Sequence, residues 1–148
     1  MLAAVRRAAA GKGFVIEEYP SPELRDTAAL VRIESAGLCG TDLQIWNGTY
    51  IGRTGPIGPS LIAGHEVVGR VVAVGARVSG VEIGDRVTTN AIEGCGKCYA
   101  CMRGLDHQCH DWRHLGVTTN GGFAEYCAAP ARTLFRVPDQ LESRHCQG

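Results

Sequence analysis

Four cysteines lie close together in one short segment of this chain and limit how that segment can fold. They are Cys95, Cys98, Cys101 and Cys109, in the spacing C-x2-C-x2-C-x7-C. Two-residue gaps allow successive thiolates to point at one centre, and four thiolates around a tetrahedral ion are typical of a closed structural zinc site. Glycines before and within the segment let the backbone wrap closely around the ion. The segment therefore predicts a zinc-binding lobe.

These cysteines have two other interpretations, an iron–sulfur motif and ordinary buried thiols. The first three also match the start of a bacterial iron–sulfur motif, which continues with a fourth cysteine after three residues and then a proline. Here the gap is seven residues, no proline follows Cys109, and there is no second cysteine set. Ordinary buried cysteines would rarely be so closely spaced. Zinc is therefore the favoured metal for this cysteine segment.

The rest of the chain predicts a mainly β fold, a barrel or sandwich of short strands. Its 148 residues suffice for one domain, and 20 glycines indicate many tight turns. We expect strands at residues 2–8, 14–19, 29–35, 66–74, 86–90, 123–129 and 134–137, with Gly69 as a bulge or close-packing point. We also expect a short helix at residues 41–47, capped by Thr41 or Asp42, and an exposed loop at residues 48–59.

Composition excludes several classes of partner. Lys+Arg and Asp+Glu are both 15, so nothing favours nucleic acid or an acidic membrane surface. No apolar stretch is long enough to span a membrane. The N-terminal segment lacks the unbroken apolar core of a secretory signal because Arg6 and Arg7 interrupt it. We therefore expect a cytoplasmic protein in which the seven cysteines do not form a disulfide framework, and metal ligation is the expected role of the closely spaced ones.

A second group of metal-type residues lies upstream of the lobe. Cys39 and Thr41 lie in Gly-Leu-Cys-Gly-Thr-Asp, and His65 and Glu66 lie in Gly-His-Glu-Val-Val-Gly. Alone, each is weak: a lone cysteine is usually a small buried apolar residue, and a His-Glu pair is more often structural. The pair is not the H-E-x-x-H metalloprotease motif, because Gly69 occupies the second histidine position.

Taken in order, however, the motifs resemble the zinc-dependent medium-chain alcohol dehydrogenase superfamily. The set is G-L-C-G-T-D, G-H-E-x-x-G, G-D-R-V, C-x2-C-x2-C-x7-C, G-G-F-A-E-Y and V-P-D, and it covers residues 1–139. The branch it is most similar to contains polyol and threonine dehydrogenases. The resemblance implies a GroES-like, partly open β-barrel with a few short helices and a zinc-binding lobe.

The resemblance also implies roles for the upstream residues. Cys39 and His65 match catalytic-zinc ligands, and Glu66 matches an acidic neighbour that ligates the zinc or lies just behind it. Thr41 matches the hydroxyl that relays the substrate proton, and Asp42 would hold the His65 imidazole. The implied reaction is NAD(P)-linked oxidation of a small alcohol or polyol to a carbonyl, in which zinc polarises the alcohol oxygen.

The sequence departs from the family after residue 139. No G-x-G-x-x-G fingerprint is present, so no cofactor-binding residue can be named, and the family's Rossmann nucleotide-binding domain is expected to be missing from this sequence. Residues 140–148 are expected to be a divergent or truncated tail, in which Cys146 is not matched to the remaining zinc ligand. Glu66 or water could complete that site. NAD or NADP would bind only with the missing domain, and the isolated chain is expected to be inactive.

Two other functions stay open at this point: a non-catalytic zinc-binding module and a co-chaperonin-like barrel. The sequence also leaves open a homo-oligomer or a partner nucleotide-binding domain. Several further residues are predicted to be structural. Cys127 is assigned to the core and Trp46 to a packed aromatic, whereas His107, His110, His114 and the Arg6-Arg7 pair are assigned to the surface.

Overall fold

The computed structural model describes residues 1–7, 11–51 and 58–142. Half of the predicted loop at 48–59, namely 52–57, lies outside the described residues, as do the end of the first predicted strand and the tail from residue 143, with Cys146.

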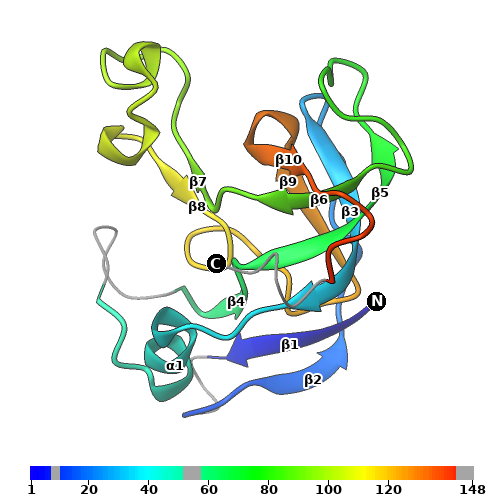
Figure 1. The fold of residues 1–148 in the computed structure, drawn as a ribbon. Coiled ribbons are helices and arrows are strands. Elements are labelled where there is room, and N and C mark those ends of the chain that lie inside the picture. Colours follow the sequence, from blue (N-terminus) through cyan, green and yellow to red (C-terminus); the bar gives the residue numbers. More distant parts are fainter. Residues whose placement is uncertain (8–10, 52–57, 143–148) are drawn as a thin grey trace.

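Two open antiparallel sheets form the body of the described chain (Figure 1). One has the order β2-β1-β4 and the other β10-β6-β5-β3-β9. The strands are β1 Leu2–Arg7, β2 Val15–Glu18, β3 Ala28–Ala36, β4 Ser60–Ile62, β5 Val67–Val74, β6 Arg86–Thr89, β9 Tyr126–Pro130 and β10 Leu134–Arg136. The predicted mainly β, GroES-like class is confirmed, and the sheets remain open rather than closing into a barrel.

The centre of the larger sheet is the long pairing of β3 with β5. Its register shifts between Ile33 and Ser35, opposite Gly69 and Val68. A Cβ on Gly69 would lie 2.3 Å from the carbonyl oxygen of Arg32, so only glycine allows this close approach. The predicted special role of Gly69 is confirmed by this irregular pairing.

The helix α1, Gly40–Asn47, begins one residue earlier than expected because Cys39 is its N-cap. The Cys39 sulfur accepts a hydrogen bond from the Thr41 N–H, and the Asp42 carboxylate accepts one from the Cys39 N–H. This reciprocal pair is a capping box in which cysteine and aspartate replace the usual residues. Helix initiation and the placement of two candidate functional side chains therefore depend on the same contacts.

Apolar side chains join the two sheets. The larger sheet has its own cluster of buried residues, which includes Val31, Val71 and Val87. Phe123 packs against Ile62 of the smaller sheet and also against the cluster of Ile45 that lies beneath α1. This packing holds α1 against the end of the sheets, where Figure 1 shows it beside β4.

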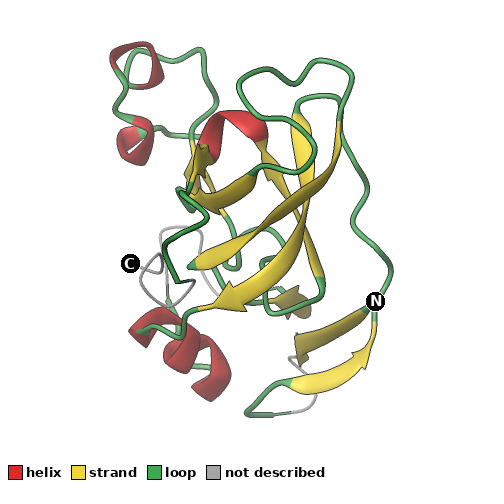
Figure 2. Cartoon of the chain, turned by 45° about the vertical axis from the view of Figure 1, so that its right-hand side comes forward, coloured by secondary structure: helices red, strands yellow, loops and turns green. Residues whose placement is uncertain are grey.

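The cysteine segment projects from the body as a separate lobe, visible at the upper left of Figures 1 and 2. It leaves the body through β7, Ile92–Glu93, and returns through β8, Arg113–His114. Within it lie two short 3-10 helices, η2 Cys101–Arg103 and η3 Asp106–Gln108. A third, η4 Ala131–Thr133, precedes β10 in the body.

Three differences from the sequence prediction concern local structure. The short strands β4, β7 and β8 were not expected, because two or three residues carry no periodic signal. The predicted strand at 123–129 is regular only from Tyr126. Arg6 does not lie on a solvated face: it is 9% exposed, and its Nε donates to the Ile45 carbonyl at the end of α1.

Candidate metal centres

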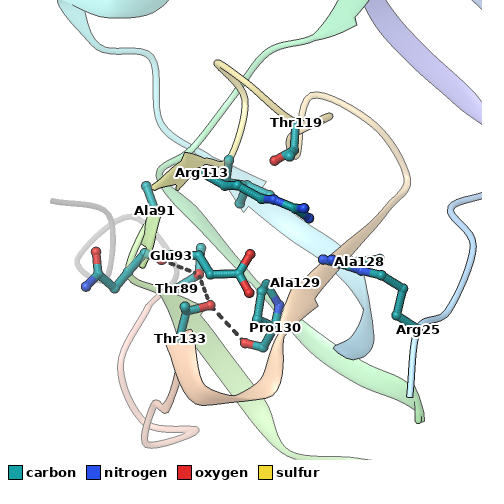
Figure 3. Close-up of a pocket in the computed structure, with 12 residues that line it drawn as sticks. Arg25, Thr89, Ala91, Glu93, Arg113, Thr119, Ala128, Ala129, Pro130 and Thr133 are labelled. Carbon is teal, nitrogen blue, oxygen red and sulfur yellow. Dashed lines mark hydrogen bonds between the residues drawn. The ribbon is translucent and has the colours of Figure 1, made fainter. Parts of the chain in front are cut away.

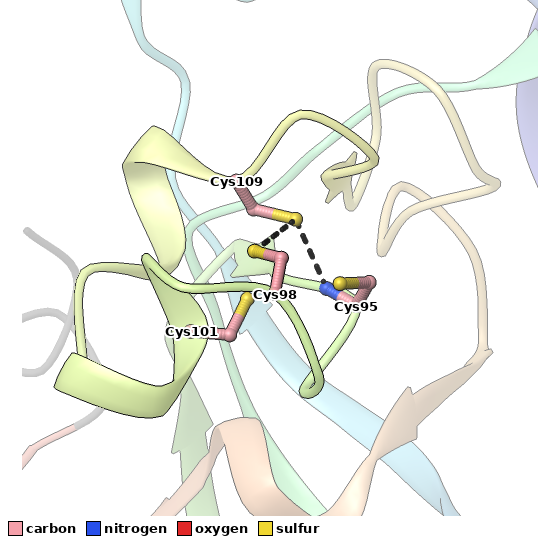
Figure 4. Close-up of side chains that lie close together, drawn as sticks. All are labelled: Cys95, Cys98, Cys101 and Cys109. Atoms are coloured by element: carbon pink, nitrogen blue, oxygen red, sulfur yellow. Dashed lines mark hydrogen bonds between the residues drawn. The ribbon is translucent and has the colours of Figure 1, made fainter.

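The four lobe cysteines converge on one point, as Figure 4 shows. Their sulfur atoms all lie within 4.8 Å of one another. The Cys109 sulfur is buried, lies 3.8 Å from the Cys98 sulfur and accepts the Cys95 N–H at 3.2 Å. No disulfide links these free cysteines. Four converging thiols are the donor set of a closed tetrahedral zinc site.

Local backbone geometry explains why the lobe closes around this point. A Cβ on Gly94 would lie 2.5 Å from the Cys101 sulfur, so glycine is required there. Gly104 ends η2 in the left-handed conformation and turns the chain back towards Cys109. Arg132 of η4 then ties the lobe to the body by donating to the Gly94 carbonyl and, at 3.0 Å, to the Asp106 carboxylate. Sequence patterns gave no signal for this long-range role of Arg132.

The lobe thiols differ in acidity. Hydrogen bonding from the Cys101 backbone lowers the pKa of the Cys98 thiol to about 6, and bonding from the Lys97 backbone lowers the pKa of Cys95. Desolvation raises the pKa of Cys101 to about 12. Because metal ligation requires thiolates, a bound cation is what would allow all four to be deprotonated together. The sulfur set fits zinc.

A second group brings Cys39 and His65 together although they are far apart in the sequence. The Cys39 sulfur lies 3.0 Å from the His65 Nε2 atom. The helix cap places Cys39, and the turn at Gly64 places His65: this glycine has φ +89°, and a Cβ there would lie 2.4 Å from the Phe123 ring. A thiol and an imidazole nitrogen that face each other this closely fit two ligands of one metal ion.

Asp42 stands behind this pair and is completely buried. Its Oδ1 accepts the Gly64 N–H at 3.1 Å and lies 3.7 Å from the His65 Nδ1 atom. That nitrogen is buried and makes no hydrogen bond within the described chain. An imidazole that binds metal through Nε2 carries its proton on Nδ1, where a carboxylate commonly receives it. A small rotation would join Nδ1 to Asp42, so the geometry fits metal binding at Nε2.

The other predicted site residues are placed less directly. Thr41 lies in the first turn of α1, beside Cys39. Glu66 directly follows His65, but its carboxylate is not part of the group that Cys39, Asp42 and His65 form among the described residues. Its backbone carbonyl accepts the Gly37 N–H at 2.7 Å. The structure therefore gathers Cys39 and His65, with Asp42 as their neighbour, and does not bring in Glu66.

His114 is a correction to the predicted surface histidines. His107 and His110 are exposed, as expected, but His114 is half-buried and its ring centre lies 5.2 Å from that of His65 in an edge-to-face arrangement. Burial, with the His65 charge as a further cause, lowers the pKa of His114 to about 4. No motif identified this residue. Only the pairing of β7 with β8 carries it from the lobe to the second group.

Cys127 and Trp46, which were both predicted to be packed in the interior, differ in their burial. Cys127 is in the core, as predicted, and burial raises the pKa of its thiol to about 12, which makes it unreactive. Trp46 is 43% exposed, so it is only partly packed.

A small cavity lies elsewhere, between the larger sheet and the base of the lobe (Figure 3). Its volume is about 40 Å³, and Arg25 and Arg113 extend into it beside Glu93. Thr89 and Thr133 close one side through a 3.3 Å hydroxyl contact. None of the candidate metal ligands lines it. The cavity is therefore separate from both metal-type groups.

The fold and these two groups define a class: a β domain with a four-cysteine lobe and a separate Cys-His pair at the start of a helix. Residues 25–139 match the family model described as the alcohol dehydrogenase GroES-like domain. The chain belongs to this family, as the motif resemblance had predicted.

Individual proteins agree with the family match. The L-threonine 3-dehydrogenase of Stenotrophomonas maltophilia is 44% identical over 145 residues, which are 97% of this chain and 42% of that protein. A zinc-binding dehydrogenase of Sinorhizobium meliloti, solved with NADP, has 30% identity and a TM-score of 0.85 over 98% of this chain and 40% of its own. Galactitol-1-phosphate dehydrogenase of Escherichia coli has 29% identity and a TM-score of 0.83, with 99% and 40% coverage. The chain thus spans about two fifths of the relatives it matches.

Within residues 1–7, 11–51 and 58–142, no helix has the length and apolarity needed to cross a membrane.

Proposed function

We propose that this chain is the substrate- and metal-binding domain of a zinc-dependent dehydrogenase that oxidises a small alcohol or polyol with NAD(P). The observation that carries the proposal is the 3.0 Å approach of the Cys39 sulfur to His65 Nε2, backed by the buried Asp42. The similarity to a threonine dehydrogenase and a polyol-phosphate dehydrogenase supports an alcohol as the substrate. The NADP bound to the Sinorhizobium relative supports a nicotinamide cofactor.

In this proposal each residue has a defined task. Cys39 and His65 hold the ion, and Asp42 receives the His65 Nδ1 proton and keeps the ring in that orientation. Glu66, after a movement of its carboxylate, or water supplies a further ligand. Zinc held there would contribute Lewis acidity toward the alcohol oxygen. The Thr41 hydroxyl, in the first turn of α1 beside Cys39, accepts the proton of the substrate hydroxyl and passes it outward.

Hydride transfer needs a nicotinamide placed against the substrate carbon. We propose that a nucleotide-binding domain, in the same protein or in a partner, supplies it. The four-cysteine lobe would have a structural task, since a site with four protein ligands has no open position for substrate. The co-chaperonin alternative gains no support, because such a role would leave the Cys39–His65 pair without a use.

Metal content per chain tests the proposal. Protein purified without added metal should contain about two zinc ions, and the Cys39→Ser variant about one. Cys127→Ala is the matched control, because Cys127 is buried in the core away from both groups and should leave two. One zinc in the unmodified chain would support the non-catalytic zinc module instead. Iron in place of zinc would contradict the assignment of the lobe.

A further inference from the structure

Arg132 extends from the body of the domain into the cysteine lobe. It lies in η4, where the residues on either side of it, Ala131 and Thr133, are buried. The Thr133 hydroxyl donates to the Pro130 carbonyl at 2.8 Å, and the Ala131 N–H donates to the Thr27 carbonyl at 3.0 Å. The body therefore fixes the backbone from which the Arg132 side chain starts, although 43% of that side chain is exposed.

The Arg132 guanidinium contacts both arms of the lobe. On the arm before the first cysteine, it donates to the Gly94 carbonyl and lies 3.9 Å from the Glu93 carboxylate. On the arm between the third and fourth cysteines, it donates to the Asp106 carboxylate at 3.0 Å. One cation therefore joins the two stretches of backbone that carry the metal-binding sulfurs.

The Asp106 carboxylate lies beside those sulfurs. Its Oδ1 atom and the Cys101 sulfur are 2.7 Å and 2.5 Å from the position that a Cβ on Gly94 would take, so both atoms lie against the same glycine. The Asp106 carbonyl also accepts the Cys109 N–H at 3.0 Å. A negative side chain thus adjoins two of the proposed zinc ligands.

The charge of the metal centre gives this carboxylate a cost. Four thiolates around a zinc ion have a net charge of about −2. A further negative charge close to such a centre repels it and favours loss of the ion, unless a cation balances that charge. The structure places the Arg132 guanidinium on Asp106, where it supplies this balance.

We infer that Arg132 is a positioning residue for the lobe metal, which slows zinc release by neutralising Asp106 beside the thiolates and by joining the two arms. An exposed ion pair alone would contribute little. Residues that support metal ligands, in contrast, typically change metal affinity by about 10–100-fold. The inference rests on zinc in the lobe and is independent of the reaction proposed at Cys39 and His65.

The rate of zinc release tests the inference without any assay of activity. The full chain carries Cys39→Ser, so that only the lobe zinc is followed, and is mixed with an excess of a chromophoric chelator. Adding Arg132→Met should speed release about tenfold. Arg103→Met is the matched control: it removes another arginine of the lobe, whose guanidinium stacks at 4.3 Å on the Tyr99 ring, and should leave the rate unchanged.

Asp106→Asn distinguishes charge compensation from a purely mechanical link. Asparagine keeps the size of the side chain and the carbonyl that accepts the Cys109 N–H, but it removes the negative charge. Alone, it should release zinc no faster than the parent. Combined with Arg132→Met, it should return the rate most of the way to that of the parent. Arg132→Lys, which retains the cation, should release zinc more slowly than Arg132→Met.

Each outcome supports or contradicts the inference. Release at the parent rate in Arg132→Met overturns it. A double variant that loses zinc as fast as Arg132→Met also overturns it, because Arg132 would then act only through its contacts. If circular dichroism shows that Arg132→Met does not fold, tenfold faster release in Asp106→Asn alone overturns the inference, and release at the parent rate supports it.

Metal content separates this result from the other proposals. A parent chain whose lobe holds no zinc would overturn the metal assignment of the lobe together with the role of Arg132. Absence of zinc from the site at Cys39 and His65 would overturn the proposed function and leave the role of Arg132 intact.

Discussion

At the scale of single residues, burial separates neighbours that look alike in the sequence. Arg6 and Arg7 are adjacent cations, yet their surroundings differ. Arg6 lies under α1 and donates to the Ile45 and Arg7 carbonyls. Arg7 is part-exposed and pairs with Glu17 of β2. A guanidinium at the carboxyl end of a helix satisfies carbonyls that the helix itself leaves unpaired and interacts favourably with its dipole.

Replacing Arg6 by Met should therefore destabilise the chain. The buried Ile45 carbonyl would keep the Gly48 N–H, at 3.1 Å, but would lose the charged Nε donor of Arg6, and a hydrogen bond from a charged group contributes about 1.5–3 kcal/mol. Urea unfolding of the zinc-loaded protein measures this loss. Arg7→Met is the matched control, and its change should be much smaller because an exposed ion pair contributes little. Equal effects of the two substitutions would contradict the assigned role of Arg6.

At the scale of elements, the lobe depends on backbone positions where no side chain fits. Gly94 is buried. The Cys101 sulfur and the Asp106 carboxylate occupy the space that a Cβ at this position would need. The same glycine offers its carbonyl to Arg132, which ties the lobe to η4. A side chain at this position would push apart two ligand segments at once.

Gly94→Ala should therefore weaken zinc binding by the lobe. The added methyl would lie 2.5 Å from the Cys101 sulfur, so the sulfur must shift and the tetrahedral arrangement is disturbed. Competition with a chromophoric zinc chelator measures the effect, and we expect at least a tenfold loss of affinity. Gly58→Ala serves as control, because a Cβ there meets nothing within 4 Å. Unchanged affinity in Gly94→Ala would show that the lobe adapts freely.

At the scale of the whole molecule, the body and the lobe are stabilised by different forces. The sheets enclose buried valine, alanine and leucine side chains around β3 and β5. In the lobe, Cys109 is the only buried residue between Cys95 and Cys109, all of which the structure describes. Hydrophobic burial can maintain the first without metal, whereas the second has almost no apolar core.

Zinc removal should consequently unfold the lobe and spare the sheets. On treatment with a strong chelator, the four lobe thiols should become reactive toward a thiol reagent, while the far-ultraviolet circular dichroism of the strands changes little. Cys127 should stay protected, since its thiol is buried in the sheet. Loss of the strand signal on chelation would show instead that the metal stabilises the entire domain. Re-addition of zinc should restore the protection and serves as the reversibility control.

Features that depend on local spacing could be predicted from the order of residues alone. The four-cysteine lobe, the main strands and the pairing irregularity at Gly69 all follow from residues close together in the chain, where ligand spacing and side-chain alternation carry the information. Cys39 and His65 were identified through an ordered set of motifs, and the structure brings the two side chains to within 3.0 Å.

The residues that surround these local features could not be predicted, because they are brought there by the packing of distant segments. The burial of Arg6, the contact of His114 with His65 and the tie from Arg132 to Gly94 each join segments distant in sequence. Glu66 is the opposite case, a sequence neighbour that is not a spatial neighbour. It follows His65 in the chain, but its carboxylate is not part of the group formed by Cys39, Asp42 and His65. Such contacts depend on strand pairing and sheet packing, in which a residue's partners are set by the whole fold rather than by its neighbours in the chain.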